Sequence, residues 1–130
     1  MIVVDPSALM AVLKKEQQAE VCARALQGAT LLMSAASLTE CLIVAGSRDF
    51  LPQLEELLRR LAPDIIAVDE SLARDAAAAY LRWGRGHHPA GLNYGDCFSY
   101  ALAQSRGCPL LFVGDDFSQT DIRSAIVEHG

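Results

Sequence analysis

Four short runs of consecutive apolar residues, separated by stretches with helical spacing, most constrain the fold of this 130-residue chain. The runs cover residues 2–4, 30–33, 65–68 and 109–113. Uninterrupted apolar runs are typical of parallel strands that are covered on both faces. Strands that alternate with helices form βαβ units, so the pattern predicts a mainly parallel sheet between two layers of helices.

The intervening stretches predict six helices. Asp5-Pro6-Ser7 opens the first, which continues over 8–13, because an acid at the cap and an early proline are helix start signals. The other helices are predicted over 16–27, 34–47, 50–61, 69–82 and 93–105, with a glycine-rich loop at 84–91. The tail at 122–127 is predicted as either an edge strand or a terminal helix. Together these elements predict an α/β fold, a single three-layer α/β/α domain over residues 1–130.

Composition indicates a compact globular chain, since 52% of its residues are hydrophobic and 21% are charged. No apolar stretch approaches the roughly 20 residues of a membrane span, and the N-terminal residues lack the regions of a secretory signal. Four cysteines lie apart in apolar contexts, as reduced thiols in a core do: Cys22, Cys41, Cys97 and Cys108. We therefore expect a cytoplasmic protein with no membrane partner.

The net charge is −5, and the chain has only two lysines, Lys14 and Lys15. A protein that binds nucleic acid through broad electrostatics should be more basic than this. The exception is a chain whose negative charge is concentrated where cations neutralise it.

Carboxylates follow several of the predicted strands. Asp5 follows the first, Glu40 lies early in the helix after the second, Asp96 opens the helix after the glycine-rich loop, and Asp115 and Asp116 follow the fourth. In an open parallel sheet, ligands bind in the crevice at the carboxyl ends of the strands. We therefore expect these acids to lie near one another at one edge of the sheet.

Each acid also has a simpler structural interpretation. Asp5 fits a helix N-cap, and Ser37-Leu-Thr-Glu40 fits a capping box that would serve its helix alone. Asp96 fits a first-turn acid, and Gly114-Asp115-Asp116 fits a polar turn. The joint pattern favours a site, because Glu40 and Asp96 have largely apolar sequence neighbours, where an uncompensated charge is costly.

Gathered carboxylates raise one another's pKa or bind cations. Oxygen ligands without a Cys/His cluster suit Mg²⁺ or Mn²⁺ rather than Zn²⁺. His87, His88 and His129 lack the spacing of metal ligands.

The motifs resemble the PIN-domain ribonucleases, in particular the VapC toxins of bacterial and archaeal toxin–antitoxin pairs. The matching segments are IVVDPSAL at the start, SLTE ending at Glu40, LNYGDCFSYALA around Asp96 and LLFVGDDFSQTDI near the end. They occur in the family's order and cover nearly the whole chain, which implies a PIN-like three-layer α/β/α fold.

The resemblance implies roles by position. Asp5, Glu40, Asp96 and Asp115 match the family's four catalytic acids, which hold the metal, and Asp116 matches a frequent fifth acid. Ser7 matches a hydroxyl residue that supports the first aspartate, and Asn93 is expected to support the loop before Asp96. Asp121 is interpreted first as a turn or cap residue. The residues expected to hold the RNA backbone are Arg82, Arg85, His87 and His88.

The implied activity is Mg²⁺-dependent hydrolysis of RNA phosphodiester bonds, with Mn²⁺ as a second candidate metal. Two divalent ions about 4 Å apart can activate a water and stabilise the leaving oxygen. The resemblance also implies a homodimer that is inhibited by a VapB-like antitoxin. The helix at 16–27 and the apolar stripe at 50–61, including Leu54 and Leu58, are candidate surfaces for these partners.

Three other interpretations compete with this one. A phospho-accepting receiver domain needs an acidic pair after its first strand and a lysine after its last, and neither is present. A non-catalytic PIN-like interaction module would bind partners without cutting, although the intact acids argue against it. A PIN-fold nuclease acting on structured DNA is the third, and the chain's small size disfavours it.

Overall fold

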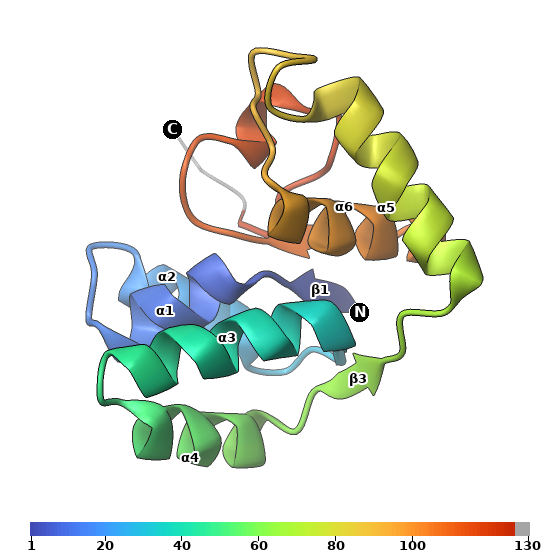
Figure 1. Ribbon diagram of the computed structural model, residues 1–130. Coiled ribbons are helices and arrows are strands. Elements are labelled where there is room, and N and C mark those ends of the chain that lie inside the picture. The colour runs from blue at the N-terminus through green and yellow to red at the C-terminus, as the bar shows by residue number, and fades with distance from the viewer. Residues whose placement is uncertain (127–130) are drawn as a thin grey trace.

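The computed structural model describes residues 1–126, which form one parallel sheet and two layers of helices (Figure 1). The sheet has the strand order β3-β2-β1-β4, with every neighbouring pair parallel. Its strands are β1 (Ile2–Val4), β2 (Leu31–Ser34), β3 (Asp64–Ile66) and β4 (Leu110–Leu111). The helices are α1 (Pro6–Leu13), α2 (Ala19–Leu26), α3 (Ala35–Ser47), α4 (Leu51–Leu61), α5 (Glu70–Trp83) and α6 (Tyr94–Arg106), with a short 3₁₀ helix, η1, at Phe117–Gln119.

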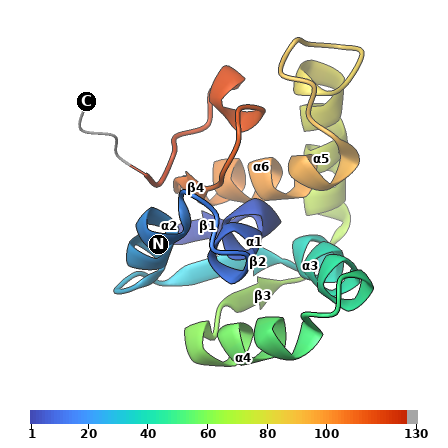
Figure 2. The same cartoon turned by 90° about the vertical axis from the view of Figure 1, so that its left-hand side faces the viewer.

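Successive residues of the central strands point to opposite faces of the sheet and so into two separate cores. Val3, Leu32 and Leu110 pack with side chains of α5 and α6. The neighbouring strand residues pack with α1, α2, α3 and α4, and they are Ile2, Val4, Leu31, Met33 and Leu111. Figures 1 and 2 show α5 and α6 together on one side and the other helices below and around the sheet. The predicted three-layer α/β/α fold with a parallel sheet is therefore confirmed.

The third strand differs from its prediction. It covers Asp64–Ile66 instead of 65–68, and Ile65 is 42% exposed. It is the edge strand next to β2, so it is not covered on both faces as its apolar sequence suggested. The prediction failed because an apolar run does not reveal whether its strand is central or at the edge.

After β4 and η1, the C-terminal segment continues to Ile126 without another helix. Ser124 forms one parallel bridge with Leu110, which agrees with the edge-strand alternative for the tail at that single position. Val127, the last residue of the predicted tail element, lies outside the described residues, as does His129.

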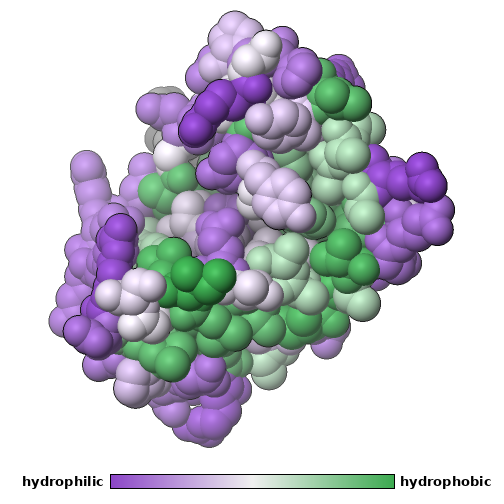
Figure 3. Space-filling view, in the orientation of Figure 1, coloured by the Kyte–Doolittle hydropathy of each residue, from purple (hydrophilic) through white to green (hydrophobic). Residues whose placement is uncertain are grey.

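The apolar stripe at 50–61 belongs to the core. Leu54 is completely buried, Leu57 is nearly so, and Leu58 packs against the same core cluster. Leu54 therefore cannot contribute to a partner surface, whereas Leu58 is only partly buried, so the role of this helix in partner binding stays a prediction. On the face seen in Figure 3, hydrophobic side chains gather over α3, where Ile43 is 62% exposed.

The strand order creates a switch point between β1 and β4. The chain proceeds from β1 outward through β2 to β3, whereas β4 returns to the other side of β1. Asp5 directly follows β1, and the Gly114–Asp116 turn lies a few residues beyond β4. Ligands of open parallel sheets bind at such a point, so the topology predicts a ligand site near these acids. Among the described residues, no helix is long and apolar enough to cross a membrane.

Candidate active site

Asp5 is the most buried acid of the described chain, with 4% of its surface exposed. It caps α1, and its Oδ2 accepts hydrogen bonds from the Ser7 backbone N–H at 3.0 Å and the Ser7 hydroxyl at 2.7 Å. Its Oδ1 accepts from the Ser99 hydroxyl at 2.6 Å. Burial raises the pKa of Asp5, and the hydrogen bonds from Ser99 and Ser7 oppose that rise. The cap interpretation is correct, but it accounts for only part of what holds this carboxylate.

Two serines complete this arrangement: Ser99, which no sequence motif indicated, and Ser37, which was predicted only as a helix cap. Ser99 and Ser37 are buried, and their hydroxyl oxygens lie 3.2 Å apart, so a chain of hydroxyls runs from α3 through α6 to Asp5. Ser99 follows Asp96 by three residues, which places both on neighbouring positions of one helix face. That spacing was the available sequence signal.

Glu40 lies in the second turn of α3, and it does not cap the helix. The N-cap is Ser34, the last residue of β2, and its hydroxyl accepts from the Ala36 N–H at 3.1 Å. The predicted Ser37–Glu40 capping box is therefore wrong, because β2 runs directly into α3 and the helix begins earlier. Burial and the charge of Asp5 raise the pKa of Glu40.

Glu40 also reaches the first turn of α6. A Cβ atom at Gly95 would overlap Glu40 Oε1, so the glycine leaves the space that this carboxylate occupies. The contact brings the acid of α3 beside the residue that precedes Asp96.

Asp96 and Asn93 cap α6 reciprocally. The Asn93 side chain accepts from the Asp96 N–H at 2.8 Å, and Asp96 Oδ2 accepts from the Asn93 N–H at 3.0 Å. Burial, together with the charges of Asp5, Asp116 and Glu40, raises the pKa of Asp96 to about 7, and the hydrogen bond from Asn93 opposes that rise. Asp96 was predicted both as a first-turn acid of the helix and as a site residue, and its carboxylate fits both predictions.

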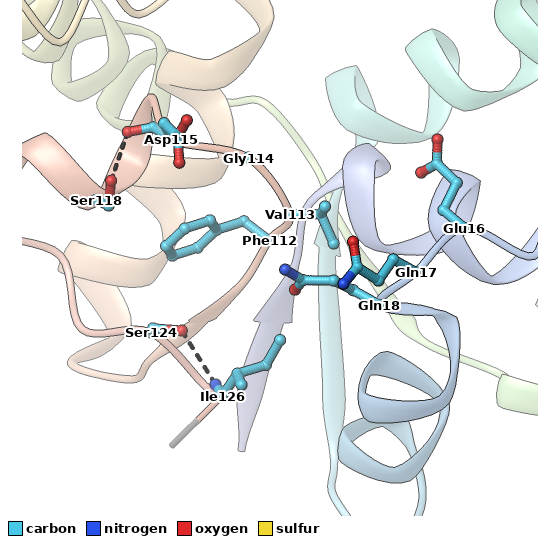
Figure 4. Close-up of a pocket in the computed structure, with 10 residues that line it drawn as sticks. All are labelled: Glu16, Gln17, Gln18, Phe112, Val113, Gly114, Asp115, Ser118, Ser124 and Ile126. Carbon is cyan, nitrogen blue, oxygen red and sulfur yellow. Dashed lines mark hydrogen bonds between the residues drawn. The ribbon is translucent and has the colours of Figure 1, made fainter. Parts of the chain in front are cut away.

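The two acids after β4 have different surroundings. Asp116 contributes to the negative charge that raises the pKa of Asp96. Asp115 lines a groove of about 640 Å³ (Figure 4). Glu16, Gln17 and Gln18, from the loop between α1 and α2, line the opposite side of this groove. Of these two acids, Asp116 is therefore the one whose charge acts on Asp96, whereas Asp115 lines the groove.

Asp121 belongs to a separate network between α5, α6 and the C-terminal segment. Its carboxylate accepts hydrogen bonds from the Tyr100 hydroxyl at 2.5 Å and from the Gln104 amide at 3.2 Å. The Trp83 indole N–H donates to the same Tyr100 oxygen at 3.0 Å. Arg82 lies 3.8 Å from Asp121 and over the Trp83 ring. These contacts give Asp121 and Arg82 a role in holding the segment that follows the acidic turn.

The loop between α5 and α6 contains the other three residues proposed for RNA. His88 Nδ1 accepts from the Ala90 N–H at 3.0 Å, and the His88 ring packs edge-on against Trp83. His87 packs edge-on against Tyr80. Arg85 lines a hollow of about 300 Å³ together with Tyr80, Asn93 and Tyr94. Of these three residues, Arg85 is the one that lines a hollow together with the first turn of α6.

The carboxylates suit a hard divalent cation in their chemistry. Within residues 1–126, no three Asp, Glu, His or Cys side chains converge as a finished set of metal ligands. Nevertheless, Asp5, Glu40 and Asp96 are oxygen donors whose charged state is disfavoured by burial and, for Glu40 and Asp96, also by neighbouring negative charges, among them that of Asp116 on Asp96. A bound cation would offset both effects, and an all-oxygen donor set suits Mg²⁺ or Mn²⁺. The residues therefore fit a metal of this kind.

Residues 2–123 match the PIN domain family. The chain is 48% identical over 125 residues to "Ribonuclease VapC30" of Mycobacterium tuberculosis, covering 93% of this chain and 95% of that protein. It is 47% identical over 129 residues to "Ribonuclease VapC" of Mycolicibacterium smegmatis, covering 93% and 97%.

Two solved structures have a similar fold. One is Mycobacterium tuberculosis VapC20, described as a sarcin-ricin loop cleaving toxin, with a TM-score of 0.75 over 94% of this chain and 96% of that one. The other is a toxin–antitoxin complex from Klebsiella pneumoniae, with a TM-score of 0.73 over 98% and 97%. Both are 16% identical to this chain, so they bear on the fold alone.

Proposed function

Because this chain belongs to the PIN-domain family and, within it, to the VapC proteins, we propose that it is a Mg²⁺-dependent endoribonuclease toxin. The observation that carries the proposal is the set of carboxylates at the switch point of the sheet. Asp5, Glu40 and Asp96 come from three different segments, and their charges act on one another. Caps alone require no such convergence.

Asp5, Glu40, Asp96 and Asp116 would hold Mg²⁺, with Mn²⁺ as the alternative and Asp115 as a further ligand on the groove side. The metal would supply a positive charge that polarises the scissile phosphate and lowers the pKa of an attacking water. It also changes the sign of the local field, so an acidic site attracts the phosphate of RNA.

The chain's own residues prepare this site before any substrate arrives. Ser7 and Ser99 donate to both oxygens of Asp5 and so fix the plane of its carboxylate. Asn93 fixes one oxygen of Asp96 and leaves the other free of the capping box. Since Asp96 has a pKa of about 7, it can hold a proton in the metal-free protein and release it when a cation binds.

The substrate and partners follow from the relatives. Proteins 47–48% identical to this chain are named ribonucleases, which supports RNA as the substrate. The VapC names support a VapB-type antitoxin as inhibitor. We further propose a cytoplasmic homodimer as the working form. We propose that the catalytic acids belong to a single PIN domain over residues 1–130.

The experiment is cleavage of a mixed RNA pool by the purified, antitoxin-free protein with Mg²⁺, with Mn²⁺ and with chelator. Asp96→Asn is the test variant, because asparagine can keep the capping hydrogen bond while losing the charge. Asp75→Asn, an exposed acid on α5, is the matched control. We expect metal-dependent cutting that Asp96→Asn reduces by about 100-fold or more, whereas Asp75→Asn stays at the wild-type rate.

Other outcomes favour the alternatives. Metal binding without cleavage of RNA would favour the non-catalytic interaction module. Cleavage of branched DNA but not of RNA would favour the nuclease that acts on structured DNA. Cleavage that persists in chelator would exclude the metal mechanism.

A further inference from the structure

Tyr94 is the most exposed large aromatic side chain of the described residues, although it lies in the first turn of the helix that carries Asp96. Its side chain is 76% exposed, whereas Phe98 on the next turn is buried. Single exposed apolar side chains are common on protein surfaces, so a role for Tyr94 is inferred from the surroundings of the ring and not from its exposure alone. Asn93 lines the same hollow as Tyr94, and its backbone N–H donates to Asp96, so the hollow lies next to the acidic site.

The ring of Tyr94 has a fixed support. It packs edge-on against Phe98, with 5.0 Å between ring centroids and 73° between planes. An edge-on contact uses the rim of a ring and leaves a face free for another π system. Asn93 and Asp96 cap the helix on either side of Tyr94, so the backbone that carries the ring is also held.

The hollow beside the ring contains a positive charge. Tyr94 and Asn93 form one side and Arg85 and Tyr80 the other, enclosing about 300 Å³. Two hydrogen bonds hold the backbone of Arg85: its N–H donates to the Leu92 carbonyl at 3.0 Å, and its carbonyl accepts from the Tyr80 hydroxyl at 3.5 Å. Arg85 is therefore an exposed cationic residue on an anchored loop, and it lines the same hollow as Tyr94.

We propose that Tyr94 is a stacking platform for one unpaired nucleobase of the RNA, with Arg85 holding the phosphate next to it. This inference rests on the proposed function, and it assigns the substrate class as single-stranded RNA around the cut. Proteins read single-stranded RNA by stacking splayed bases on aromatic rings, whereas a base inside a duplex offers no free face. A free aromatic face, a neighbouring cation and an acidic site for the scissile phosphate match three successive parts of such a strand.

The first test compares Tyr94→Ala and Tyr94→Phe on a short single-stranded oligoribonucleotide. Removing a stacking ring costs about 1–3 kcal/mol, so Tyr94→Ala should raise KM by about 5- to 100-fold at nearly constant kcat. Tyr94→Phe keeps the ring and should stay within about twofold of the wild type. Leu81→Ala is the control, because Leu81 is 66% exposed on α5 and lies outside the hollow. A Phe variant as weak as the Ala variant would overturn the stacking role.

The second test removes the base instead of the ring. An oligonucleotide with one abasic position should bind the wild type as weakly as the intact oligonucleotide binds Tyr94→Ala, and the two losses should not add. Additive losses at every position would overturn the platform. Binding is measured by fluorescence anisotropy in the Asp96→Asn background, so it is independent of cleavage.

The two proposals can fail separately. If the wild type cleaves RNA and the Tyr94 variants bind and cleave like it, the platform is wrong and the nuclease stands. If no RNA is cleaved, the anisotropy series still decides whether Tyr94 binds a base. Loss of affinity for an inhibitory protein in Tyr94→Ala, with RNA affinity unchanged, would assign the ring to a protein partner and overturn the platform.

Discussion

Asp5 shows how a buried carboxylate can stay available for a ligand. Three donors, two from Ser7 and one from Ser99, satisfy its oxygens inside the protein, where burial alone would favour the neutral acid. The Ser7 hydroxyl in turn accepts from the Val113 N–H at 3.0 Å, so the same serine joins the end of β1 to the segment after β4. One small side chain thus connects the two sides of the switch point.

The residue-scale prediction concerns Ser99. Ser99→Ala removes the only donor given to Asp5 Oδ1 among the described contacts and leaves the Ser37 hydroxyl without this partner. An unsatisfied buried polar group costs about 1–3 kcal/mol, and we expect the free energy of unfolding to fall by that amount. Because the carboxylate also loses its fixed orientation, Mg²⁺ should bind more weakly. Urea denaturation and calorimetric titration of Mg²⁺ measure the two effects.

Ser105→Ala is the matched control, because it makes the same change on the same helix. The Ser105 hydroxyl donates to the Leu102 carbonyl and has no contact with the acids. The role assigned to Ser99 is wrong if both variants bind Mg²⁺ with the same affinity.

At the scale of elements, the acids come together because each lies at or near the start of a helix. Two of these helices, α1 and α3, begin directly at the end of a strand. α1 begins one residue after Asp5, α3 begins immediately after β2, and α6 begins with the capping box that contains Asp96. The start of α1, the second turn of α3 and the first turn of α6 therefore lie close enough for their carboxylates to act on one another. Gly95 is the point where α3 and α6 approach through Glu40.

The element-scale prediction concerns this approach. Gly95→Ala would place a methyl group where Glu40 Oε1 lies. The end of a glutamate side chain can move, so we expect the fold to survive with a change in the free energy of unfolding within about 1 kcal/mol. The displaced carboxylate should lower the cleavage rate by about 10- to 100-fold, because small misplacements of catalytic groups are costly.

Gly46→Ala is the control for this change. Gly46 lies in α3, and a Cβ atom there would meet nothing within 4 Å. Replacing a helical glycine by alanine should stabilise the protein by about 0.5–1 kcal/mol without an effect on cleavage. Equal activity of the two alanine variants would show that the position of Glu40 against α6 does not matter.

The elements also show what sequence patterns can predict. The order of helices and strands followed from apolar runs and helix start signals, and Asp5 and Asp96 were recognisable because caps leave a local signature. The start of α3 was not, since Ser34 and Ser37 both fit a cap and the end of β2 decides between them. The hydrogen bond between Ser37 and Ser99 was not predicted, because it joins residues 62 positions apart and no local sequence pattern indicates such a contact.

At the scale of the whole molecule, the acidic site imposes a cost on the metal-free fold. The chain has a net charge of −5, and several of its negative charges face one another at the sheet edge. Burial and repulsion raise the pKa values of Asp5, Glu40 and Asp96 together. The stability of the protein should therefore depend on both pH and divalent cations.

The whole-molecule prediction gives this dependence a sign. Asp96 has an ordinary pKa of 3.8 and a pKa of about 7 in the fold. Between these values the native protein binds more protons than the unfolded chain, so in chelator the free energy of unfolding should fall as pH rises from about 4 to about 7. Asp5 and Glu40 act in the same direction. Urea denaturation at several pH values measures the slope, which should be smaller in Asp96→Asn than in the wild type and unchanged in Asp75→Asn.

Mg²⁺ should reverse this loss where the acids are ionised. A cation that binds only the native state stabilises it by mass action, so Mg²⁺ at ten times its Kd should raise Tm by about 5 °C near pH 8. The increase should shrink near pH 5, because protons then occupy the site that the cation needs. NaCl of equal ionic strength controls for general screening. An increase in Tm that is the same at both pH values, or that Asp96→Asn retains in full, would mean that the cation binds elsewhere and that the cost of the acidic crevice is offset by something other than a metal.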